Sequence, residues 1–232
     1  MRSGHPRLLL SLSIAASLLL CLALWAVFRY APLELNMGAV QKVFYFHVSA
    51  NWAGMLGFLV ALVVSVIYLR TADLKWDIAA VAGIELGMVF TAMGIVSGMI
   101  WARPTWNTWW TWDPRLTTIA VVEMVYAAYF MLRQGIEECE RRARFGAVYS
   151  IVGFISVPLT FFSIRFARTI HPVVIGSGDS SNQVFNMTPA MLQTFLLCLF
   201  AFSVLFVVLL WHRLRLGLLA QEVEDAANAC WE

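Results

Sequence analysis

The sequence predicts an all-α membrane protein, a single bundle of six transmembrane helices with no separate soluble domain. Its 232 residues are 61% hydrophobic and only 13% charged, with a mean hydropathy of +0.76. A soluble globular protein is nearer half apolar and about a quarter charged. Six apolar runs each approach the ~20 residues that cross a hydrocarbon core of about 30 Å. Because the backbone must satisfy its own hydrogen bonds in lipid, we expect each run to be helical.

The six expected spans are distributed along the whole chain. In chain order they cover residues 8–28, 48–69, 78–101, 116–132, 146–163 and 190–211. The first run follows Arg2 and Arg7, as the core of a cleaved signal peptide would. It is longer than a usual signal core, however, and no small-x-small cleavage site closes it. We therefore expect this run to remain as the first helix.

Short motifs support the later spans. In the third span, Gly94 and Gly98 have the spacing that permits close contact with a neighbouring helix. Asp113 precedes a proline at the first helical position of the fourth span, and Thr188 does the same for the sixth; both pairs are good helix starts. Pro158 removes a backbone donor from the fifth span, where we expect a kink.

The basic residues orient the bundle, because six spans place both termini on one side. That side carries ten of them: Arg2, Arg7, Arg70, Lys75, Arg133, Arg141, Arg142, Arg144, Arg213 and Arg215. The other side carries six: Arg29, Lys42, Arg103, Arg115, Arg165 and Arg168. The richer side is expected to be cytoplasmic, so both termini are too, and the other face is the outer one. The six outer cations indicate either an anionic ligand or anchoring to lipid headgroups.

Charge and cysteine usage exclude several classes of protein. A net charge of +2 gives no support for nucleic-acid binding. The four cysteines lie far apart and form no C-x-x-C pattern, so neither a disulfide framework nor a thiol-exchange site is expected.

The segment from Trp106 to Pro114 contains four tryptophans, and Trp101 lies just before it. An aromatic belt at the membrane interface spreads one or two tryptophans over each helix end. Four in one short connection favour a flat platform on which a planar π-ligand can stack. If the residues between Pro104 and Pro114 form a short helix of roughly 13 Å, every third residue would share a face. The tryptophans on that face would be Trp106, Trp109 and Trp112.

Two histidines fall on the same outer face as the tryptophans. His47 lies in the apolar sequence 44–48, where a lone histidine is more often a hydrogen-bonded core residue than a ligand. His171 follows Arg165 and Arg168 at steps of three, and this arrangement favours a ligand role for the two histidines over a core role. Two neutral imidazoles, an aromatic floor and guanidinium groups together fit haem, with iron between the nitrogens and the propionates on arginine. Arg115 could join the two later arginines.

The run 109–117, WWTWDPRLT, resembles the tryptophan-rich WWD motif of haem-handling proteins in cytochrome c maturation. The length, the six spans and one histidine on each side of the motif resemble the haem exporter protein C family, CcmC, over nearly the whole chain. CcmF shares the motif but is much longer, and CcsA-type synthases carry additional histidines. The resemblance implies that His47 and His171 are the axial ligands of the haem iron. It also implies an aromatic haem surface made by Trp106, Trp109, Trp110, Trp112 and Asp113.

The resemblance further implies a role in System I of cytochrome c maturation, in the bacterial inner membrane. Haem b would be a transient cargo, delivered to the haem chaperone CcmE with the help of the small membrane protein CcmD. The ATPase CcmA and the membrane subunit CcmB would complete an ABC transporter complex. The sequence offers no set of nucleophile, acid and base for a bond-forming step, so we do not expect an enzyme.

Two other functions remain open from the sequence. A proton-coupled secondary transporter would use Glu85 and Glu123, because carboxylates inside spans are functional suspects. The competing role for both is an interhelical hydrogen bond, and no inverted repeat supports a transporter. A b-type cytochrome subunit for electron transfer would place histidine pairs deep in helices, whereas His47 and His171 lie near span ends.

Overall fold

A computed structural model describes residues 6–35, 37–166, 169–171 and 187–229, except for the side chains of residues 6, 164–166, 228 and 229. The long helices are α1 (Pro6–Trp25), α2 (Lys42–Thr71), α3 (Leu74–Trp106), α4 (Pro114–Gln134), α5 (Cys139–Gly153), α6 (Ser156–Phe166) and α7 (Pro189–Ala229). A π-helical turn, η1 (Ala26–Tyr30), continues α1, and a 3-10 turn, η2 (Ala39–Gln41), precedes α2. Within the described residues, six helical stretches are long and apolar enough to cross a membrane, which confirms the polytopic all-α prediction.

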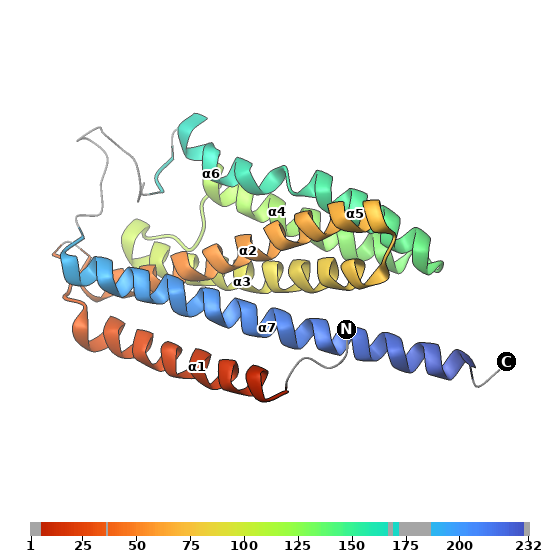
Figure 1. The fold of residues 1–232 in the computed structure, drawn as a ribbon. Helices are drawn as coiled ribbons and strands as arrows, with labels where there is room; N and C mark the ends of the chain where they lie inside the picture. The colour runs from red at the N-terminus through yellow and green to blue at the C-terminus, as the bar shows by residue number, and fades with distance from the viewer. Residues whose placement is uncertain (1–5, 36, 167–168, 172–186, 230–232) are drawn as a thin grey trace.

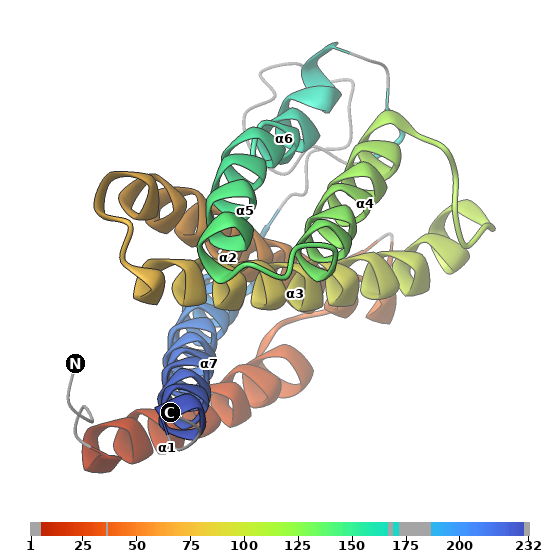
Figure 2. The ribbon, with the colours of Figure 1, turned by 90° about the vertical axis from the view of Figure 1, so that its right-hand side faces the viewer.

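Helices α2 and α3 form the centre of the bundle. Helices α1 and α7 pack together on one side of this pair, and α4, α5 and α6 lie on the other (Figures 1 and 2). The first turn of α1 and the last turn of α7 point toward the same end of the molecule (Figure 1). The start of α2, the end of α3 and the starts of α4 and α7 therefore share the opposite end.

Glycines bring the backbones of α2 and α3 into direct contact. A Cβ added at Gly57 would lie 2.6 Å from the carbonyl oxygen of Gly83 and 2.8 Å from the Cα of Gly87. No ordinary side chain fits at such distances. Small residues at facing positions are the usual means of close helix packing in membranes, because lipid supplies no hydrophobic force between helices.

The fifth span is broken, as Pro158 predicts. Helix α5 ends at Gly153 and α6 begins at Ser156. Proline has no N–H to donate to the carbonyl four residues earlier, which belongs to Phe154. That carbonyl instead accepts from the amide of Val157, at 3.0 Å.

The third span is longer than expected and absorbs part of the tryptophan segment. Helix α3 continues through Pro104 to Trp106 and ends where Asn107 adopts a left-handed conformation, with φ of 57°. Arg103 Nη1 donates to the backbone and side-chain oxygens of Asn107, at 2.6 and 2.7 Å. The short helix considered between Pro104 and Pro114 does not form: 107–113 is irregular, because this cap ends α3 at Asn107.

The two capping predictions are confirmed. Asp113 Oδ1 accepts from the amide of Arg115 at 3.0 Å, at the start of α4. Thr188 Oγ1 accepts from the amide of Met191 at 3.3 Å, at the start of α7. Both bonds satisfy amides that have no partner inside the helix.

Candidate ligand-binding site

An apolar cavity of about 420 Å³ lies at the end of the bundle where α3 and α4 meet. Residues of α2, α3, α4, α6 and α7 line it, and His171 closes it from the connection after α6. Of the aromatic residues expected here, Trp106, Trp109 and Trp110 line the cavity, together with Trp101. The fold thus brings together segments separated by more than a hundred positions in the sequence.

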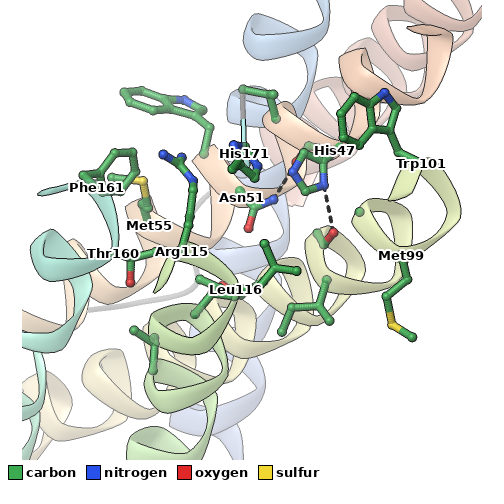
Figure 3. A pocket seen from close by; sticks show the side chains of 18 of the residues that line it. His47, Asn51, Met55, Met99, Trp101, Arg115, Leu116, Thr160, Phe161 and His171 are labelled. Carbon is green, nitrogen blue, oxygen red and sulfur yellow. Dashed lines mark hydrogen bonds between the residues drawn. The ribbon is translucent and has the colours of Figure 1, made fainter. Parts of the chain in front are cut away.

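The side chains of His47 and His171 face each other in this cavity (Figure 3). Their ring centres are 6.3 Å apart, and the ring planes are inclined by 35°. Trp106 presents its ring to His171 in an edge-on contact at 6.5 Å. The two histidines therefore lie on the same side of the bundle and close enough to share one ligand atom.

Helix α3 holds the imidazole of His47. Its Nδ1 lies 2.9 Å from the carbonyl oxygen of Gly94 (Figure 3). A carbonyl can only accept, so Nδ1 carries the proton and Nε2 keeps its lone pair. Gly98 leaves room for the ring, because a Cβ there would lie 2.9 Å from His47 Cε1. Gly94 and Gly98 were expected to allow close helix contact. In the structure, Gly94 binds the His47 ring through its carbonyl and Gly98 leaves space for that ring.

Trp112 has a different environment from the other tryptophans of the motif. It is 77% exposed, does not line the cavity and contacts Trp110 edge-on at 5.8 Å. Because the connection is irregular, Trp106, Trp109 and Trp112 do not form the expected helical face. Trp101 and Trp106 pack edge to face at 5.1 Å, which makes a wall from the last turns of α3.

Arg115 brings a positive charge into the apolar cavity (Figure 3). Its guanidinium carbon lies 5.6 Å from the ring centre of Phe161, a cation–π distance. Within the described part of the chain, no hydrogen-bond acceptor contacts that guanidinium group. A partly buried guanidinium group without a hydrogen-bond acceptor is costly, and an anionic ligand would offset that cost.

Asp113 does not line the cavity, and is 9% exposed. Besides capping α4, its carboxylate accepts from Thr169 Oγ1 at 2.7 Å and from the amide of Ile170 at 2.9 Å. The hydroxyl oxygen of Thr169 in turn accepts from the amide of His171 at 3.0 Å. Sequence reasoning missed Thr169, because no local pattern links it to a residue so far back in the chain.

Two predicted arginines cannot be placed in the site. Arg168 and the side chain of Arg165 lie outside the described residues. The prediction that they meet carboxylates of a ligand therefore stays a prediction.

The carboxylates that suggested a transporter have different surroundings. Glu85 in α3 pairs with Arg213 in α7 through two bonds of 2.5 and 2.9 Å, an interhelical contact of the kind expected for a structural role. Glu123 in α4 has a buried Oε1 without a hydrogen-bond partner among the described residues. Neither residue lines the cavity.

Comparison with known proteins gives a consistent result over the whole chain. The sequence profile of the family described as Heme exporter protein C matches residues 3–229. The Heme exporter protein C of Bradyrhizobium diazoefficiens is 31% identical over 221 residues, covering 94% of this chain and 82% of the relative. The protein of that name from Rhodobacter capsulatus is 31% identical, with coverages of 91% and 87%. The one from Escherichia coli K12 is 27% identical, with coverages of 91% and 84%.

Proposed function

The chain belongs to the Heme exporter protein C family, and we propose that it holds haem b between His47 and His171 for delivery to a haem chaperone of the CcmE type. Family membership gives the general role, haem handling for cytochrome c maturation by a multi-pass membrane protein. We propose which residues bind the haem, which form of haem is bound and which protein receives it.

The separation of the two imidazoles carries the proposal. A metal–imidazole bond is about 2 Å long, and the ring centre lies about 1 Å beyond the nitrogen, so two axial imidazoles have centres roughly 6 Å apart. The observed separation is 6.3 Å. The hydrogen bond from His47 Nδ1 to Gly94 leaves Nε2 as the coordinating nitrogen. Such an anchor on the far nitrogen is typical of metal-binding histidines.

The remaining walls match the other parts of haem. The apolar cavity and its tryptophans suit the porphyrin ring, which stacks on or against aromatic side chains. Arg115 supplies a cation that contacts no hydrogen-bond acceptor in the described part of the chain and suits a propionate. Arg165 and Arg168 are the further candidates for that role. Asp113 does not line the cavity, and we assign it to the support of the site.

The orientation follows from the distribution of basic residues. The site lies at the end opposite the last turn of α7, and the proposed cytoplasmic position of both termini would put it on the periplasmic face. Trp109 is 54% exposed, so one edge of the site is accessible to a chaperone. CcmD, the ATPase CcmA and the membrane subunit CcmB are the proposed partners in the membrane complex.

The decisive experiment compares the haem content of His47→Ala and His171→Ala with that of the wild-type protein after purification in detergent. We expect both to lose most of the haem and the absorption bands of a low-spin, two-histidine species. His212→Ala is a matched control, because His212 is exposed and bonds Ser13 at the other end of the bundle. Wild-type haem content and spectra in either site variant would contradict the proposal.

A further inference from the structure

We propose that Asp113 is a positioning residue, whose carboxylate, through Thr169, sets the place of His171 opposite His47. This inference rests on the proposed function, since it explains how one of the two haem ligands is held. In this proposal, Asp113 itself does not contact the haem.

The carboxylate of Asp113 joins two distant parts of the chain. Its Oδ1 accepts from the amide of Arg115 at 3.0 Å and from Thr169 Oγ1 at 2.7 Å. Its Oδ2 accepts from the amide of Ile170 at 2.9 Å. The Thr169 hydroxyl donates its one proton to Asp113, and its oxygen accepts from the amide of His171 at 3.0 Å. Every residue in the described segment 169–171 is thereby bonded to Asp113, directly or through one hydroxyl.

Helix capping alone does not account for this arrangement. Asp73 caps α3 in the same way, by accepting from the amide two residues later at 3.1 Å, and makes its other contact with its neighbour Lys75 at the surface. Asp113 makes two further bonds, to residues 56 and 57 positions away, and is only 9% exposed. Hydrogen bonds to a charged acceptor in a shielded place are the stronger ones, so they can fix residues 169–171, which are not helical.

The bonds also couple two contacts of the cargo. Asp113 fixes the first turn of α4, from which Arg115 reaches into the cavity, and the same carboxylate fixes the segment that carries His171. The cation for a propionate and the axial imidazole are thus held as one unit. A partner that displaces this unit would loosen both contacts together, as the release of a transient cargo requires.

The test separates positioning from capping. Asparagine caps a helix as well as aspartate does. Three groups donate hydrogen bonds to the Asp113 carboxylate, however, and the NH₂ group of asparagine would face one of them with a donor instead of an acceptor. We therefore expect Asp113→Asn to keep α4 and to bind haem about tenfold more weakly, the effect of losing one charge-assisted hydrogen bond. Thr169→Val, which lacks the hydroxyl, should weaken haem binding to a similar extent. Thr169→Ser, which keeps the hydroxyl, should bind haem as the wild type does. Asp73→Asn is the matched control and should bind haem as the wild type does.

Spectra decide whether the loss is one of positioning. In Asp113→Asn and Thr169→Val, we expect part of the bound haem to lose the low-spin spectrum of two histidine ligands, and added imidazole to restore it. A purely structural role would lower the yield of folded protein without changing the spectrum of what remains. If Asp113→Asn does not fold, the Thr169→Val and Thr169→Ser pair decides the question.

The failure of this inference differs from the failure of the proposed function. Wild-type affinity and spectra in both Asp113→Asn and Thr169→Val, with haem lost in His171→Ala, would overturn the positioning role alone. Undiminished haem binding in His171→Ala would overturn the proposed function, and this inference with it.

Discussion

His47 Nδ1 and the carbonyl oxygen of Gly94 are 2.9 Å apart, so the second and third helices meet through the imidazole that faces the cavity. The carbonyl belongs to an unbroken helix and is already an acceptor within it. The same oxygen also accepts from Ser97 Oγ at 3.0 Å, so His47 is one of several donors to this carbonyl. The orientation of the imidazole is therefore tied to the most closely packed pair of helices in the bundle, α2 and α3.

Replacing Gly98 by alanine should displace the His47 ring. The added Cβ would lie 2.9 Å from His47 Cε1, closer than such carbon atoms ordinarily approach. Overpacking of this kind costs about 1–3 kcal/mol, which corresponds to haem binding weaker by roughly tenfold or more if the ring yields. Titration of the haem-free protein followed by absorption measures the change. Gly135→Ala is the control, since its Cβ would meet nothing nearer than 3.7 Å; equal affinities in the two variants would count against the role of Gly98.

Arg115→Gln should weaken the binding of haem and spare that of its dimethyl ester. A charge-assisted hydrogen bond contributes about 1.5–3 kcal/mol, so the loss for haem should be roughly tenfold to a hundredfold. Esterified propionates carry no charge, and the ester should bind the variant and the wild type alike. Arg29→Gln, at an exposed cation on the same end of the molecule, controls for general surface charge. Equal losses for both ligands would indicate that Arg115 supports the cavity's shape instead.

The fold was largely predictable because its signals are local. The apolar runs are set by the thickness of the bilayer, and the caps at Asp113 and Thr188 and the break before Pro158 depend on a few neighbouring residues. The end of the third helix was not predictable from the sequence. Helix α3 continues through Pro104, and it ends where Asn107 adopts a left-handed conformation.

Most residues of the candidate site could be named from the sequence, whereas the contacts between them could not. Histidines, tryptophans and an arginine on one face indicate the kind of ligand from residue type alone. The separation of His47 from His171, the exclusion of Trp112 from the cavity and the bonds of Asp113 to Thr169 depend on how distant helices are placed. No periodicity within a single segment encodes those contacts.

Asp77→Asn should destabilise the bundle far more than Lys75→Gln. Asp77 and Arg133 form a two-bond pair, at 2.6 and 2.8 Å, that joins α3 to α4 with side chains 10% and 14% exposed. Removing one partner of a buried pair leaves an uncompensated charge and costs about 3–5 kcal/mol. The pair of Lys75 with Asp73 lies at the surface, where solvent screens it, and its loss should leave the midpoint of thermal unfolding unchanged. Similar midpoints for both variants would mean that Arg133 finds another acceptor.

Trp112→Ala and Trp106→Ala should affect different steps. Trp106 lines the cavity and contacts His171, so its truncation should lower the amount of haem bound. Trp112 is 77% exposed and outside the cavity, and truncating it should leave haem content and spectrum intact. An exposed indole beside a binding site is, however, the kind of residue that dominates protein–protein contacts. We therefore expect Trp112→Ala to slow haem transfer to a purified CcmE-type chaperone, measured by the absorption of the recipient after separation.

Leu35→Ala, at the 99% exposed Leu35, is the control for loss of exposed apolar surface. Transfer at the wild-type rate from haem-loaded Trp112→Ala would show that this ring is not part of the docking surface, and a loss of haem from that variant would show that it belongs to the cargo site after all.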